Sequence, residues 1–402
     1  MRKILLSFIL ILLVNLPVLA DDVIEGENIE ESFCAETSIN SSNEPVTQSK
    51  NIIVLDRKNL LPLYEKDAYT KVAMASTTKI LTCIIALESC SLEEIVPISQ
   101  KAASVSGSTL GITQNTKINM NDLLYGLMLR SGNDCAIAIA EYISGSTENF
   151  SVLMNKKAKE LGLKNSNFVT PHGLDDPKHY TTAYELAILT NYALNNLKFL
   201  EIVSTKTCTI YLNDIPRTIS NTNELLGNTQ GVYGVKTGFT FEAGRCLVSS
   251  CKRNNLDIII VVLGADTKRI RTKDSIQLIN YIFKNYNYIN VKNTLKNAFN
   301  DYLPIFNTTY KLEKTNDIPI LELDILENYD FPLSDTDCLN LHTQIYTIES
   351  FNSDIKPGTI VGKLHLYRDN DLLCSVNILI KNELSKNSWK YYFFRILSHY
   401  KV

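Results

Sequence analysis

The chain has 402 residues, of which 45% are hydrophobic and 21% charged, and its formal net charge is −3. This ordinary globular composition excludes wholesale disorder, collagen and coiled coil, and the length suggests about two to three domains. A near-neutral chain lacks the concentrated basic face that nucleic-acid binding needs, so we expect no nucleic-acid partner.

Residues 1–20 have the pattern of a secretory signal peptide. Arg2 and Lys3 form a positive start, residues 5–13 form an apolar run, and residues 18–20 end the segment as a small-residue cleavage site. A transmembrane anchor is the alternative. The apolar run is short for a span of ~20 residues, however, and an asparagine and a proline interrupt it, so the signal peptide is favoured.

Residues 21–50 predict a disordered acidic leader. They hold eight acidic residues and one lysine, together with many serines and asparagines. Such a segment cannot bury enough apolar surface to offset the entropy of folding. Together with the signal peptide, it predicts an exported protein whose folded part begins at residue 51.

The nine cysteines predict no metal centre. Their number is odd, their spacings are wide, and the sequence has neither a CxxC pair nor a Cys/His cluster with zinc spacing. Several lie in apolar runs, where cysteine acts as a small hydrophobic residue.

The next part of the chain mixes strand and helix patterns. In chain order these are strands at 51–56 and 61–64, helices at 76–88, 119–130, 133–143, 147–161 and 182–194, a hairpin of strands at 246–251 and 257–263, and a helix at 273–285. Thr182 and Glu185 have the spacing of a capping box. The order predicts an α/β domain at 51–287 with a helical insertion.

Residues 288–384 predict a small antiparallel β domain. Leu321, Leu323 and Ile325 alternate with acidic residues, and the segments 363–366 and 375–380 likewise alternate apolar with polar residues. Turn-forming residues such as Pro357 separate these runs.

Residues 385–402 predict an amphipathic helix that lies on a membrane surface. On a helix, Trp389 and Phe393 share an apolar face, whereas Lys390 and Arg395 lie on the other face, and no acidic residue follows in this segment. A helix docked on its own domain is the alternative.

Ser76-Thr77-Thr78-Lys79 begins a predicted helix and suits nucleophilic chemistry. Ser76 and Lys79 share one helical face. A serine hydroxyl needs a base beside it, and a lysine can be that base if its pKa falls toward neutrality. Alone, the pattern is common and also fits a serine that caps a helix.

Two further short motifs are Ser131-Gly132-Asn133 and Lys236-Thr237-Gly238. The first links two apolar helices, where a hydroxyl and an amide can reach a cleft, although a plain helix turn explains it as well. The second follows the strand-like segment 232–235, so a cation and a hydroxyl would project from a strand edge. Gly238 would let a substrate backbone approach closely, which suits capture of a terminal carboxylate.

The three motifs together, in this order and context, occur in class A β-lactamases and penicillin-binding proteins. From about 51 to 384, the chain resembles the low-molecular-weight penicillin-binding proteins that are serine-type D-alanyl-D-alanine carboxypeptidases. The segment 171–175 (PHGLD) adds to the resemblance, whereas Arg245 stands where an aromatic or small residue is expected. The resemblance implies a transpeptidase-like domain, with an antiparallel sheet and flanking helices, followed by a small all-β domain.

The resemblance also implies how the motif residues act. Ser76 would be the nucleophile, Lys79 the general base and Ser131 a proton relay. Asn133 would orient the substrate amide, and Lys236 and Thr237 would bind the terminal carboxylate. The backbone N–H groups of Ser76 and of Phe239, which follows Gly238, would form the oxyanion hole. Arg271 would add charge near the carboxylate, and His172 is interpreted as a structural loop residue.

The implied substrate is a peptidoglycan stem peptide ending in D-Ala-D-Ala, and β-lactams would acylate the same serine. No cofactor or metal is required. The implied location is the outer face of the cytoplasmic membrane, facing the cell wall.

Of three other functions, only the first remains open from the sequence. A D,D-endopeptidase that cuts crosslinks shares every motif. A class A β-lactamase needs a glutamate where Asn167 stands, and Glu160 is the nearest acid. A wall-binding protein on an inactive scaffold would normally lack Ser76, Lys79 or Lys236, and all three are present.

Overall fold

The computed structural model describes residues 44–309, 318–325, 329–347, 355–384, 393 and 396, and the chain divides into two compact units between Tyr281 and Ile282. The domain limit expected between residues 287 and 288 stays a prediction.

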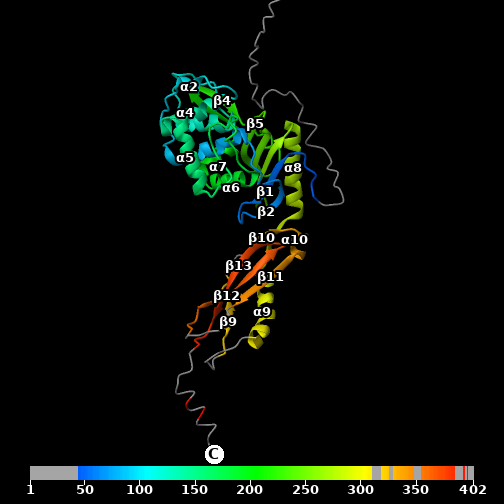
Figure 1. Ribbon diagram of the computed structural model, residues 1–402. Helices are drawn as coiled ribbons and strands as arrows, with labels where there is room; N and C mark the ends of the chain where they lie inside the picture. Colours follow the sequence, from blue (N-terminus) through cyan, green and yellow to red (C-terminus); the bar gives the residue numbers. More distant parts are fainter. Residues whose placement is uncertain are drawn as a thin grey trace, which may run out of the picture. The chain divides into compact units, whose positions relative to one another are not determined.

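The first unit contains a five-stranded antiparallel sheet in the order β2-β1-β7-β6-β5 (Figure 1). The strands are β1 (Asn51–Asp56), β2 (Pro62–Lys66), β5 (Val232–Thr240), β6 (Gly244–Arg253) and β7 (Leu256–Ala265). The run from Ile258 to Leu263 in the central strand β7 is fully buried. Such a continuous apolar run is typical of a strand that is covered on both faces.

Helices cover both faces of this sheet. On one side lie η2 (Ala75–Thr78), α1 (Lys79–Ser89), α2 (Gln100–Ala103), α3 (Met120–Leu129), α4 (Asn133–Ser144), α5 (Thr147–Glu160), α6 (Ala183–Leu194), α7 (Leu197–Ser204) and the hairpin of β3 (Thr207–Leu212) and β4 (Ile215–Ser220). Helix α8 (Lys268–Asn285) runs along the other side of the sheet (Figure 1). The expected sheet with flanking helices and a helical insertion is confirmed.

The end of the expected leader is held by the fold, which corrects that expectation for its last residues. Ser49 is fully buried, and its backbone N–H and its hydroxyl both donate to the carboxylate of Asp274 in α8, at 2.7 and 2.6 Å. The Nζ of Lys66 also donates to the carbonyl of Ser49. Residues 1–20 and the leader before residue 44 lie outside the described residues.

The expected capping box forms only in part. The hydroxyl of Thr182 accepts the backbone N–H of Glu185 at 3.1 Å, as a cap of α6 should. The carboxylate of Glu185 instead accepts the backbone N–H of Asn165 at 2.8 Å. The carboxylate of Glu185 therefore binds a distant loop, and the capping box is left incomplete.

The second unit holds a four-stranded antiparallel sheet in the order β11-β12-β13-β9 and a separate pair, β10-β8. The elements are β8 (Asn287–Asn290), α9 (Lys292–Thr309), β9 (Leu321–Leu323), β10 (Asp330–Leu333), α10 (Asp335–Leu339), β11 (Leu341–Thr347), β12 (Ile360–Arg368) and β13 (Asp371–Ile380). Leu295 and Phe299 of α9 share a core with Leu364 and Ile378 of the sheet. The antiparallel sheet is as expected, but the sequence analysis did not predict α9.

Among the described residues, no helix is both long and apolar enough to cross a membrane. The amphipathic segment expected at 385–402 lies outside the described residues except for Phe393 and Ile396, whose side chains are exposed.

Candidate active site

The first motif lies where η2 passes into α1. Ser76 belongs to η2 and Lys79 is the first residue of α1. The fully buried Lys79 donates from Nζ to the hydroxyl of Ser76 at 2.9 Å, to Oδ1 of Asn133 at 2.8 Å and to the carbonyl of His172 at 2.8 Å. Three contacts of this length fix the amine beside the serine hydroxyl.

The second motif supplies one of those contacts from the start of α4. The side-chain amide of Asn133 donates to the carbonyl of Ser106 at 2.8 Å, and its backbone N–H donates to the carbonyl of Ser108 at 2.7 Å. These bonds turn the Oδ1 of Asn133 toward Lys79. Ser131, two residues earlier, is buried and has a φ of +59°.

The third motif lies within the edge strand β5. The strand continues to Thr240, so the expectation that it ends before Lys236 is corrected. Lys236 and Thr237 are buried; the Nζ of Lys236 donates to the carbonyl of Thr237 at 2.9 Å, and the hydroxyls of Thr237 and Thr222 are 2.8 Å apart.

Gly238 brings the third motif onto the first. A Cβ placed on Gly238 would lie 3.1 Å from the backbone nitrogen of Ser76 and 3.2 Å from the side chain of Ala75. Only a residue without a side chain permits this approach of β5 to η2 without displacing a neighbour. Ser76 of η2 and Phe239, which follows Gly238 in β5, therefore lie on two segments that pack directly against each other.

Arg245, which departs from the pattern of the resembled family, stacks on Phe239. The two residues form a cross-strand pair between β6 and β5, and the guanidinium carbon lies 3.8 Å from the centre of the ring. This geometry is that of a cation–π contact.

His172 and Arg271 are engaged inside the fold. The Nδ1 of His172 accepts the backbone N–H of Leu174 at 3.1 Å, and burial, together with the charge of Lys79, lowers the pKa of His172 to about 3. Such a ring is a poor base at neutral pH. Arg271 is fully buried and forms an ion pair with Glu224, so its expected place beside a substrate carboxylate stays a prediction.

Asp134 is a supporting residue that the sequence analysis did not single out. Its carboxylate accepts three successive backbone N–H groups, those of residues 110–112, at 2.9, 2.8 and 3.2 Å. An acidic side chain at the start of the otherwise apolar helix α4 was the available signal. Asp134 ties the segment before α3 to the second motif.

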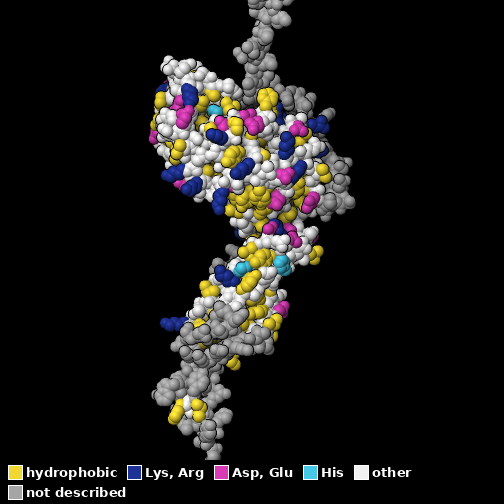
Figure 2. All heavy atoms as spheres, in the orientation of Figure 1, with side chains coloured by type: hydrophobic (Ala, Val, Ile, Leu, Met, Phe, Trp, Pro, Cys, Tyr) yellow, Lys and Arg dark blue, Asp and Glu magenta, His cyan; other side chains and the backbone are white. Residues whose placement is uncertain are grey.

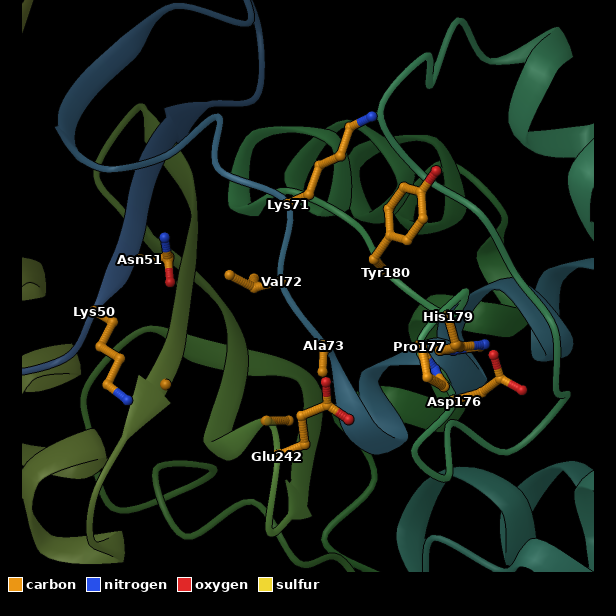
Figure 3. Close-up of a pocket in the computed structure, with 12 residues that line it drawn as sticks. Lys50, Asn51, Lys71, Val72, Ala73, Asp176, Pro177, His179, Tyr180 and Glu242 are labelled. Carbon is orange, nitrogen blue, oxygen red and sulfur yellow. The ribbon is translucent and has the colours of Figure 1, made fainter.

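An open cavity of about 440 Å³ borders the segment that leads into Ser76. Figure 3 shows Ala73 of that segment between Glu242 and His179, with Val72 farther along the same segment. The residues that line the cavity belong to none of the three motifs.

Comparison with known proteins gives consistent matches. Residues 38–267 match the family model described as D-alanyl-D-alanine carboxypeptidase. D-alanyl-D-alanine carboxypeptidase DacF of Bacillus subtilis is 32% identical over 368 residues, which cover 86% of this chain and 88% of that protein.

Solved structures agree with these sequence matches. Penicillin-binding protein 5 of Haemophilus influenzae has a TM-score of 0.66 at 26% identity, covering 85% of this chain and 99% of that one. The D-alanyl-D-alanine carboxypeptidase DacD of Francisella tularensis, at 24% identity, has a TM-score of 0.68 and shares the fold over 90% of this chain and all of that one.

Proposed function

The chain belongs to the family of D-alanyl-D-alanine carboxypeptidases, and from that premise we propose which of its residues carry out the reaction. It is a serine-type carboxypeptidase that removes the terminal D-Ala from peptidoglycan stem peptides. The observation that carries our assignment is the 2.9 Å hydrogen bond between the Nζ of Lys79 and the hydroxyl of Ser76.

Ser76 is the nucleophile and Lys79 the general base of this proposal. The hydroxyl oxygen of Ser76 bonds to the carbonyl carbon of the penultimate D-Ala while its proton passes to the neutral form of Lys79. The amide bond then breaks as the departing D-Ala amine takes up a proton through Ser131. Water attacks the resulting ester, and the hydroxyl of Ser76 recovers its proton.

The other motif residues hold the substrate. Lys236 and Thr237 present a cation and a hydroxyl to the terminal carboxylate, and Asn133 orients the substrate amide. The oxyanion forms between the backbone N–H groups of Ser76 and Phe239, where fixed donors stabilise developing charge. The close approach of Gly238 to Ser76 supports this pairing.

The comparisons do not favour the alternative activities. A β-lactamase needs a carboxylate that holds the deacylating water, and Glu160 is a poor candidate because it ends α5, is 50% exposed and pairs with Lys157 at 3.4 Å. We therefore expect penicillin to leave a long-lived acyl-enzyme.

The test combines a peptide and a chromogenic cephalosporin. The purified protein should remove one alanine from a pentapeptide ending in D-Ala-D-Ala over many turnovers, as followed by mass spectrometry. It should release about one equivalent of cephalosporin product and then almost stop, because an acyl-enzyme lifetime of minutes corresponds to a barrier near ~21 kcal/mol, against ~16 kcal/mol for ten turnovers per second.

Three outcomes would contradict this proposal. Sustained cephalosporin turnover would make the protein a β-lactamase, and cleavage of a crosslinked peptide dimer in preference to the pentapeptide would make it an endopeptidase. Acylation of Ser76→Ala would exclude Ser76 as the nucleophile. Ser104→Ala, at an exposed serine of the same unit, is the matched control and should acylate like the wild type.

We also propose that the protein is exported and bound to the outer face of the cytoplasmic membrane. The signal-peptide pattern of residues 1–20 and the aromatic and basic composition of 385–402 support this location.

A further inference from the structure

The backbone immediately before the proposed nucleophile has an unusual conformation. Ala75 has a φ of +49°, a region that residues with a side chain rarely occupy. Its carbonyl accepts the hydroxyl of Thr78 at 2.8 Å. Gly173 packs directly on this carbonyl, and a Cβ on Gly173 would overlap it. The turn is therefore held by contacts from outside as well as by its own hydrogen bond.

His179 supplies one of those outside contacts. Its Nδ1 lies 2.9 Å from the backbone N–H of Val169 and therefore accepts it, so in the neutral ring the proton is on Nε2. Nε2 lies 2.8 Å from the hydroxyl of Thr78 and donates to it. The hydroxyl of Thr78 is then directed to the carbonyl of Ala75, which completes a chain of hydrogen bonds from His179 to the turn.

The same ring also holds the loop that contacts Lys79. Val169 and Thr170, whose backbone N–H groups lie 2.9 and 3.3 Å from Nδ1, lead directly into His172. The carbonyl of His172 accepts Lys79 at 2.8 Å. One imidazole thus connects the turn that carries Ser76 with the loop that orients Lys79.

We propose that His179 is a positioning residue for acylation, which holds Ser76 and Lys79 in register through Thr78 and the loop at 169–172. The inference rests on the roles proposed above for Ser76 and Lys79. His179 itself contacts neither residue in the hydrogen bonds described here, and it borders the cavity beside Ala73 (Figure 3).

The neutral ring that this arrangement needs is favoured by its surroundings. His179 is only 3% exposed. Burial lowers its pKa to about 4, with the charge of Asp176 opposing this and that of Lys79 adding to it. At neutral pH the ring therefore keeps one donor and one acceptor.

The test measures acylation by a chromogenic cephalosporin under single-turnover conditions, which separates the acylation rate constant from the dissociation constant of the non-covalent complex. Thr78→Val removes the hydroxyl at nearly constant volume, and His179→Leu removes both ring contacts. We expect each to lower the acylation rate constant by ~10- to 100-fold, because small displacements of reacting groups cost factors of this size. The dissociation constant should change little.

Two variants separate positioning from a merely structural role. Thr78→Ser keeps the hydroxyl and should recover most of the wild-type rate constant. Thr190→Val is the matched control, because Thr190 is equally buried and its hydroxyl donates to the carbonyl of Leu186 at 2.7 Å within α6. It should lower stability but leave the acylation rate constant within about twofold of the wild type, because its hydrogen bond involves neither the turn at Ala75 nor the loop at 169–172.

The outcomes are distinguishable from those that test the function itself. A wild-type protein that is not acylated at all overturns the proposed function. If the wild type is acylated but Thr78→Val and Thr190→Val are equally slow, the role of His179 alone is overturned. The same holds if Thr78→Val is as fast as the wild type. If His179→Leu does not fold, the three threonine variants decide the question.

Discussion

Two non-glycine residues of the candidate site have a positive φ, Ala75 at +49° and Ser131 at +59°. Conformations of this kind cost of order 1–3 kcal/mol each and persist only where surrounding contacts hold them. For Ala75 the contacts come from Thr78 and Gly173. Near the other position, Asp134 ties the start of α4 to the backbone of residues 110–112 by three hydrogen bonds.

A prediction at the residue scale concerns that carboxylate. Asp134→Asn replaces one acceptor oxygen by a donor that faces backbone N–H groups, so we expect the free energy of unfolding to fall by ~2–4 kcal/mol. Asp122→Asn is the control, because Asp122 is also buried but accepts a single backbone N–H from another segment, that of Tyr211 at 2.9 Å. Urea denaturation should give a clearly smaller loss for Asp122→Asn, and equal losses would contradict the importance of the three bonds.

The sequence predicts the residues of the three motifs but not the residues that hold them. The types and spacing of Ser76, Lys79 and Asn133 predict their chemistry, because the proposed mechanism needs a nucleophile, a base and an amide in that order. His179 bonds to Thr78, about a hundred residues earlier, and to the loop at 169–170. Asp134 bonds to the backbone of residues 110–112. Tertiary packing alone brings these partners together. Their roles could not be predicted without the structure.

At the scale of elements, local signals predict boundaries well where a cap is present. Helix α6 begins after Thr182 as expected, and β1 covers the predicted strand. Helix α9 was missed because Pro304 lies inside it, where a proline usually ends a helix, and because helix propensity is a weak guide. The packing of Leu295 and Phe299 on the second sheet stabilises it, and that packing is visible only in the fold.

The loop at 169–180 carries two buried histidines and should make stability depend on pH. The pKa of His179 is lowered to about 4 from 6.5, so above pH 6.5 the ring is neutral in both the folded and the unfolded chain. As the pH falls from 6.5 to 4, the unfolded chain binds a proton that the folded chain excludes, and stability is lost. This one histidine should cost about 2 kcal/mol between pH 7 and pH 5.

This expectation is checked by comparing variants at two pH values. The destabilisation caused by His179→Gln, measured by urea denaturation, should be about 2 kcal/mol smaller at pH 5 than at pH 7, because the variant no longer loses the proton-linked stability. Thr190→Val, at a buried site whose side chain does not titrate, should cost the same at both pH values. A cost for His179→Gln that does not change with pH would contradict the buried neutral ring.

At the scale of the whole molecule, the first unit carries charges of both signs, whereas residues 385–402 carry only basic ones. Basic and acidic side chains are interspersed over the visible face of the first unit (Figure 2). Residues 385–402 contain lysines and an arginine but no acidic residue. Electrostatic attraction to an anionic membrane should therefore come from this segment rather than from the body of the enzyme.

The last prediction tests the proposed membrane segment by ending the chain at Leu384. The cut must follow Leu384, because this residue is 2% exposed and exchanges two backbone hydrogen bonds with Ile355, both at 2.9 Å. The shortened enzyme should remain in the supernatant when vesicles containing anionic lipid are sedimented, whereas the full mature chain should sediment with them.

Basic side chains contribute ~1 kcal/mol each at such a surface, so loss of Lys390, Arg395 and Lys401 alone should weaken binding by roughly 100-fold. Vesicles of neutral lipid should retain the full chain less well, and both forms should turn over the pentapeptide at the same rate because the motifs lie in the first unit. Equal sedimentation of the two forms would place the membrane contact elsewhere in the chain.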